Sequence, residues 1–116
     1  MDRAAFLADL YSQFPELDGR LGNHGGYGIF HCEISDFRGE LLRAMDEGKL
    51  WNVERYLRFI ETCLAEANEE VANAIDVSFI EELALSNVTS QRKSAIKDRA
   101  SKQFFDQLVE HNPDWR

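Results

Sequence analysis

Apolar side chains recur every three or four residues along most of this 116-residue chain, and that spacing restricts the fold more than any other feature. The clearest stripe consists of Phe30, Ile34, Phe37, Leu41 and Met45. It predicts an amphipathic helix from about Ile29 to Glu47, with Gly48 as its C-terminal cap. No segment shows the two-residue alternation, bounded by hairpin turns, that indicates β-strands. We therefore predict an all-α fold.

Four more segments carry the helical pattern, and capping residues indicate where they begin. Residues 3–14 form the first expected helix, with Asp2 as its N-cap and Pro15 ending it. Residues 50–67 form the third, and residues 69–86 the fourth, which Asn68 can cap. Ser90 can cap a last helix that ends before residue 113, a proline.

These segments predict a single helical domain over residues 1–116, a bundle of about five helices. Because so few residues separate the third and fourth helices, we expect them to form a central antiparallel hairpin. No apolar run is long enough to span a bilayer, and the N-terminus lacks the apolar core of a signal peptide. Cys32 and Cys63 have no C-x-x-C spacing and are expected to be reduced thiols. We expect a cytoplasmic protein.

The formal net charge is −8, and the charges are unevenly distributed. Residues 1–89 carry 7 basic and 17 acidic side chains, whereas residues 90–116 carry 6 and 4. Seven acids lie between residues 59 and 91 without one Lys or Arg, and we call them the acidic run: Glu61, Glu66, Glu69, Glu70, Asp76, Glu81 and Glu82. Such a surface repels DNA and RNA and attracts a basic protein, so we predict these seven residues to bind a partner.

The Gly- and His-rich segment 22–33 is the alternative site for function. His24, His31, Cys32 and Glu33 are all competent metal ligands. However, neighbouring helical side chains point about 100° apart, and no paired ligand spacing supports them. The glycines also lack the Lys-Ser/Thr of a phosphate-binding loop. We predict a joint between two helices, with no metal or cofactor. A protein that binds a small ligand or a metal through this segment, or an enzyme that uses it, stays the second interpretation.

Catalytic patterns are weak elsewhere. Glu33, Asp36 and Glu40 share one helical face, but acid–base chemistry needs a cleft that separates their pKa values. There is no nucleophile elbow and no recognisable Cys-His or Ser-His constellation. A basic patch, Arg92, Lys93, Lys97, Arg99 and Lys102, opens the last helix. It is expected to be a solvated face that pairs with the acidic helices, and not a nucleic-acid or membrane site. The prediction is a non-enzymatic protein.

The stretches "FHCEISDFRGELLRAMDEGK" and "VERYLRFIETCLAEANEEVANAIDVSFIEEL" resemble a family of small bacterial helical proteins. The resemblance is carried by a helix motif that here runs from Asn73 to Glu81, with Ile80 in place of the usual leucine. It implies a helical structure and no catalytic residues. Proteins of this kind are similar to immunity proteins, which neutralise toxins passed between competing bacteria. The resulting hypothesis is an immunity-type inhibitor; its partner and oligomeric state stay open.

Overall fold

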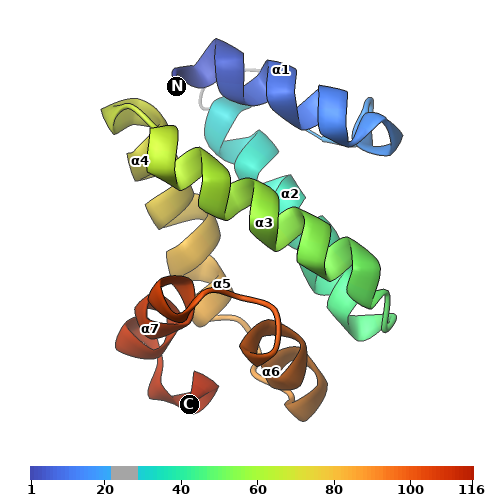
Figure 1. Ribbon diagram of the computed structural model, residues 1–116, viewed down its shortest axis with the longest axis vertical. Coiled ribbons are helices and arrows are strands. Elements are labelled where there is room, and N and C mark those ends of the chain that lie inside the picture. Colours follow the sequence, from blue (N-terminus) through green and yellow to red (C-terminus); the bar gives the residue numbers. More distant parts are fainter. Residues whose placement is uncertain (22–28) are drawn as a thin grey trace.

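The computed structural model describes residues 1–21 and 29–116, and within these ranges it is helical and contains no strand (Figure 1). The α-helices are α1 (Arg3–Gln13), α2 (Ile29–Asp46), α3 (Leu50–Glu66), α4 (Glu69–Ile75), α5 (Glu82–Ala84), α6 (Ser90–Lys97) and α7 (Lys102–His111). The 3-10 helices η1 (Pro15–Leu17) and η3 (Pro113–Trp115) follow α1 and α7, and the π-helix η2 (Asp76–Glu81) joins α4 to α5. The all-α prediction is confirmed.

Three predicted helix ends are confirmed by their hydrogen bonds or backbone angles. The carboxylate of Asp2 accepts the backbone N–H of Ala5 at 2.9 Å, and the side chain of Asn68 accepts that of Val71 at 3.0 Å. Each of these bonds satisfies one N–H group that has no partner within its helix. Gly48 ends α2 with a φ of 70°, which a residue with a side chain rarely adopts. Local capping chemistry therefore positions α1, α2 and α4.

The predicted last helix is wrong in two respects, because it is two helices and because its N-cap is a different residue. Thr89, and not Ser90, caps α6, accepting the Arg92 N–H at 3.1 Å. The chain then leaves the helix, and Ser101 caps α7 by accepting the Phe104 N–H at 3.2 Å. A contact with another helix stabilises this break, since the Ser101 N–H donates to Glu61 Oε1 on α3 at 2.8 Å. The predicted count of about five helices was consequently too low.

The predicted fourth helix is present as one continuous segment, but its middle is the π-helix η2. The buried side chains of this segment include Val71, Ile75, Phe79 and Leu83. A strict four-residue spacing turns by about 40° per step around an α-helix, so these side chains would drift off one face. The wider turn of a π-helix, with its i→i+5 bonds, reduces that drift. The π-helix keeps the stripe directed at the core.

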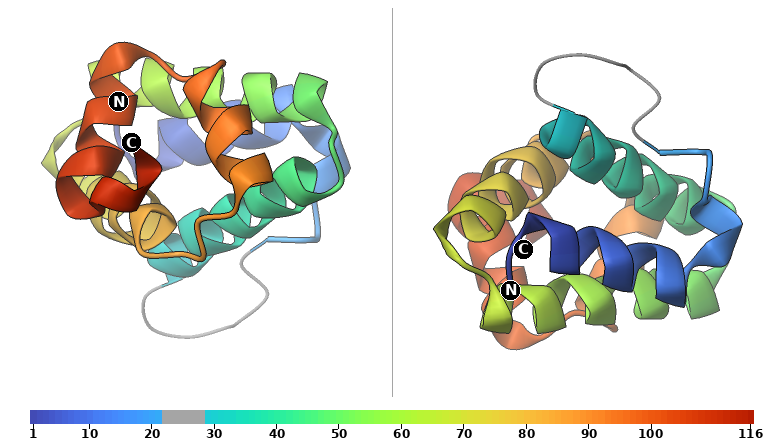
Figure 2. Two further views of the ribbon diagram at one scale, coloured as in Figure 1. Left: turned by 90° about the horizontal axis from the view of Figure 1, so that it is seen from below. Right: turned by 90° about the horizontal axis from the view of Figure 1, so that it is seen from above.

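The predicted hairpin of the third and fourth helices, α3 and α4, is not the centre of the fold. The more extensive packing of α3 is against α2, which also contacts η2 and α6. In Figure 1, α4 leaves the end of α3 at an angle. Figure 2 shows α1 on one face of the α2–α3 pair and α6 with α7 on the opposite face. The helices α2 and α3 therefore form the centre of the fold, joined by the tight turn at Gly48.

An aromatic cluster fills the core between these helices. The ring of Phe37 on α2 lies 5.7 Å from that of Phe14, 5.8 Å from that of Phe59 and 5.9 Å from that of Phe79. These separations are typical of favourable aromatic pairs. The predicted α2 stripe from Phe30 to Met45 is buried throughout. Among the described helices, none is long and apolar enough to cross a membrane.

Candidate functional site

The acidic run spans the second half of α3, then α4, η2 and α5. Glu66 is the last residue of α3, and Glu69 and Glu70 form the first turn of α4; all three are exposed. Acids in a first turn interact favourably with the positive end of the helix. Asp76, also exposed, opens η2. Within residues 1–21 and 29–116, no ion pair involves any of these four carboxylates.

Two other members of the acidic run have intramolecular partners. Glu61 is half-buried and accepts the Ser101 N–H, beside a groove of about 310 Å³ between α3 and α7. Glu82 pairs with Arg38 of α2. Glu81 is half-buried. The carboxylates of Glu61 and Glu82 therefore join α3 and α5 to other helices, although Glu82 is also exposed, and the carboxylates of Glu66, Glu69, Glu70 and Asp76 form the exposed part of the run that has no ion pair within the described residues.

A polar junction joins α2 to η2. His31 Nδ1 lies 2.7 Å from the hydroxyl oxygen of Ser78, whose residue is only 5% exposed. The backbone carbonyl of Ser78 accepts a hydrogen bond from Arg38 Nη1 at 2.8 Å. Partial burial lowers the pKa of Arg38. Ser78 thus contacts two α2 side chains, and a hydrogen-bonded Ser–His pair exists that the sequence pattern did not indicate.

Glu33 lies in the first turns of α2 but contacts a different helix. It is 7% exposed, and its Oε2 accepts the hydroxyl of Tyr11 on α1 at 2.8 Å. Burial, followed by the hydrogen bond to Glu33 and its negative charge, raises the pKa of Tyr11 well above its ordinary value. A buried carboxylate requires such a donor. This bond fixes α1 against the beginning of α2.

These contacts bear on the alternative site at residues 22–33. His31 contacts η2, whereas Glu33 contacts α1. Cys32 is a free, half-buried thiol. In the part of the chain that the structure describes, no group of three His, Cys, Asp or Glu side chains could hold a metal ion. Residues 22–28, which include His24, lie outside the described residues.

The remaining charged candidates have separate partners. Glu40, on the acidic face proposed for α2, pairs with Arg20 at 3.1 Å. In the basic patch, Arg92 donates twice to Asp46 of α2, at 2.8 and 2.7 Å. The hydrogen bond from Arg92 lowers the pKa of Asp46. The pairing expected between the basic patch and the acidic helices is therefore made by Arg92 with α2, outside the acidic run.

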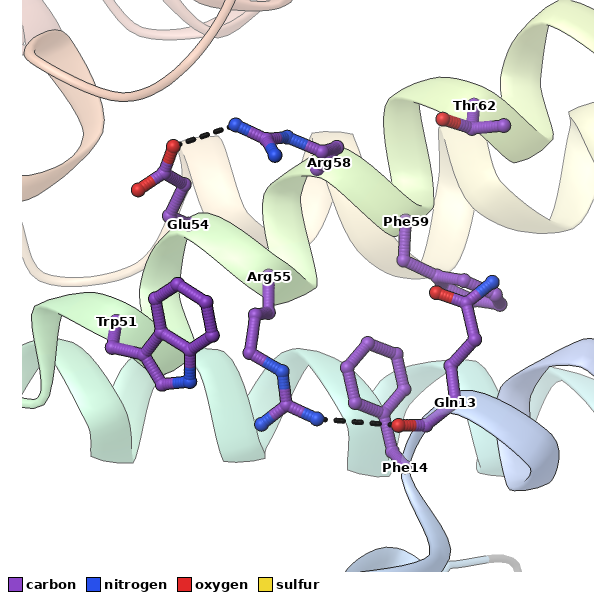
Figure 3. A pocket seen from close by; sticks show the side chains of 8 residues that line it. All are labelled: Gln13, Phe14, Trp51, Glu54, Arg55, Arg58, Phe59 and Thr62. Atoms are coloured by element: carbon purple, nitrogen blue, oxygen red, sulfur yellow. Dashed lines mark hydrogen bonds and ion pairs between the residues drawn. The ribbon is translucent and has the colours of Figure 1, made fainter.

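A groove of about 250 Å³ on the outer side of α3 was not predicted (Figure 3). Its lining is Gln13, Phe14, Trp51, Glu54, Arg55, Arg58, Phe59 and Thr62. Trp51 is 73% exposed, although it is the largest kind of side chain. The guanidinium of Arg55 lies 4.9 Å from the centre of the Phe14 ring and donates to the Gln13 carbonyl at 3.2 Å. The sequence did contain a signal, because Trp51 falls outside the apolar stripe of its helix.

The fold and these surfaces define the class as an all-α domain with an exposed acidic segment. The chain belongs to the family described as Domain of unknown function (DUF7674), whose model matches residues 7–111. The matched range runs from within α1 to the end of α7 and contains the acidic run, the polar junction and the whole α3 groove. No curated protein and no solved structure matches the chain.

Proposed function

We propose that this protein is a non-enzymatic, cytoplasmic binding module of the immunity type, which neutralises a bacterial toxin through its acidic surface. The observation that carries the proposal is the set of exposed carboxylates on Glu66, Glu69, Glu70 and Asp76. They lie on consecutive elements, in a stretch of the chain that contains no Lys or Arg. The partner is a basic protein; neither nucleic acid nor a membrane is its ligand.

The proposed interaction depends on the charge of the toxin as well as on the charge of this chain. A nuclease toxin needs a positively charged cleft, because it must hold phosphate groups. Carboxylates on a helical surface can occupy such a cleft in place of phosphates. Charges of this kind accelerate association at long range, and salt screens the acceleration. The proposal therefore predicts a fast, salt-sensitive encounter between the two proteins.

The test is a charge-reversal series on the full chain. Glu66, Glu69 and Glu70 are changed together to lysine, and association with the toxin domain encoded by the neighbouring gene is followed by stopped-flow fluorescence. We expect association to slow by about tenfold or more at low salt, and the difference to shrink at high salt. A matched control reverses three exposed acids elsewhere, Asp9, Glu110 and Asp114. It changes the net charge equally and should slow association much less.

Two outcomes would contradict the proposal. If the two triple variants associate at the same rate, the surface assignment is wrong. If the gene beside this one encodes a metabolic enzyme and not a secreted toxin, and expression of this chain protects no cell from a toxin, the immunity function is wrong.

A further inference from the structure

The outer face of α3 combines an exposed aromatic side chain with arginines. Trp51, Arg55, Arg58 and Thr62 follow one another at intervals of four, three and four residues, so they share one face of the helix. Trp51 is the most exposed of the large apolar side chains in the described ranges, and the groove of Figure 3 lies beside it. Trp, Tyr and Arg are enriched among the few residues that contribute most of the binding energy of protein interfaces. The 73% exposure of Trp51 beside these arginines indicates that this face binds another protein surface.

The charges of this face distinguish it from the rest of the molecule. The whole chain carries −8, so two copies repel each other over most of their surfaces. On this face, Arg58 pairs with Glu54 at 2.6 Å and Arg55 pairs with Glu16 at 3.4 Å. The positive charges of these two arginines and the negative charges of these two glutamates cancel locally. The outer face of α3 is therefore a place where a second copy meets no net repulsion.

We propose that the outer face of α3 is a two-fold interface with a second copy of this chain. In a two-fold interface the same patch meets itself, so the helices α3 of the two copies cross antiparallel. A crossing centred near position 56 brings Glu54 of each copy to Arg58 of the other. The same register places each Trp51 beside the Arg58 and Thr62 end of the opposite helix, where the indole can contact a guanidinium. The charge pattern of the face is thus complementary to itself.

The first experiment measures self-association directly, by sedimentation equilibrium from micromolar to millimolar protein. We expect a monomer–dimer equilibrium, and Trp51→Ala should raise its dissociation constant by at least about thirtyfold. Leu85→Ala is the matched control, because Leu85 is 65% exposed but lies outside α3. Trp115 is fully buried, so a blue shift of fluorescence with increasing concentration reports Trp51. Thermal melts establish that both variants are folded.

The second experiment tests the register. Arg58→Glu and Glu54→Arg each place like charges across the two-fold axis, so each variant alone should be monomeric. Mixed in equal amounts, the two variants place opposite charges across the interface at both contacts, and they should form a heterodimer. A monomeric mixture would overturn the register.

Three results would overturn the interface itself. These are a wild-type protein that stays monomeric up to millimolar concentration, a dimer that Trp51→Ala leaves unchanged, and a groove that captures a different protein while the chain remains monomeric. None of these results depends on a toxin, so the interface and the proposed immunity function can fail separately.

Discussion

The hydrogen bond between Tyr11 and Glu33 is expected to stabilise the fold, and removal of the Tyr11 hydroxyl tests this. Tyr11→Phe removes one hydroxyl and keeps the ring, so the packing of α1 changes little. The change leaves the carboxylate of Glu33, only 7% exposed, without the donor at 2.8 Å. A hydrogen bond to a charged group contributes about 1.5–3 kcal/mol, against a total stability on the order of 10 kcal/mol for a domain of this size. We expect Tyr11→Phe to lower the free energy of unfolding by about 1.5–3 kcal/mol at pH 8.

The pH dependence follows from the raised pKa of Tyr11. In the unfolded chain Tyr11 loses its proton near pH 10, whereas in the folded protein it keeps the proton to higher pH. The contribution of Tyr11 is therefore complete below pH 10 and is lost as the pH rises above it. At pH 11 the loss is about 1.4 kcal/mol. The Tyr11→Phe variant has no hydroxyl to titrate at this position. Its free energy of unfolding should therefore fall less between pH 8 and pH 11 than that of the wild type.

The assay is urea unfolding followed by circular dichroism at pH 8 and pH 11. Burial also raises the pKa of Tyr56, but that residue is present in both proteins and cancels in the comparison. Glu33→Gln keeps an acceptor oxygen but removes the charge, so a double-mutant cycle with it isolates the part of the interaction that depends on the charge of Glu33. The predicted role of the Tyr11–Glu33 bond is wrong if Tyr11→Phe lowers the free energy of unfolding equally in the wild-type and Glu33→Gln backgrounds and leaves its fall between pH 8 and pH 11 unchanged.

Two further predictions concern contacts between distant parts of the chain. The lowered pKa of Asp46 means that its bond to Arg92 stabilises the fold above the ordinary Asp pKa, near 4, and is lost as the pH falls. Asp46→Asn should therefore lower stability at pH 7 by up to about 1 kcal/mol and should flatten the acid limb of the stability curve; an unchanged acid limb would contradict this. Trp115 is fully buried, and its indole N–H donates to the Ala84 carbonyl at 2.8 Å. Trp115→Phe should cost about 1–3 kcal/mol in urea unfolding, and a loss below the error of the measurement would show that the C-terminus is not anchored by this bond.

Much of the fold could be predicted from the sequence because its determinants are local. The cap at Asn68, the turn at Gly48 and the stripe that begins at Phe30 depend on residues close together in the chain. The break before α7 could not be predicted, because the apolar period continues across it from Ile96 to Phe104. That break is held by the bond between Ser101 and Glu61, which are 40 residues apart.

The candidate site was predictable in part for the same reason. The acidic run is a local property of composition, and the structure leaves Glu66, Glu69 and Glu70 exposed. Sequence could not show that Glu61 and Glu82 have partners within the fold, since those partners lie on other helices. The groove beside Trp51 was partly predictable, because a tryptophan outside the apolar stripe of its helix must face solvent or a partner.

The π-helix η2 makes the chain unequally tolerant of changes in length. Because a π-helix already holds more residues per turn than an α-helix, loss of one residue from Asp76–Glu81 can be absorbed by a return to α-helical hydrogen bonds, whereas a further inserted residue would turn everything that follows by about 100° and rotate Leu83 and Ala84 out of the core. An extra residue between α6 and α7 would only lengthen an existing break. Relatives of this protein should therefore vary in length around residues 98–101 and should not gain residues between Asn68 and Ala84.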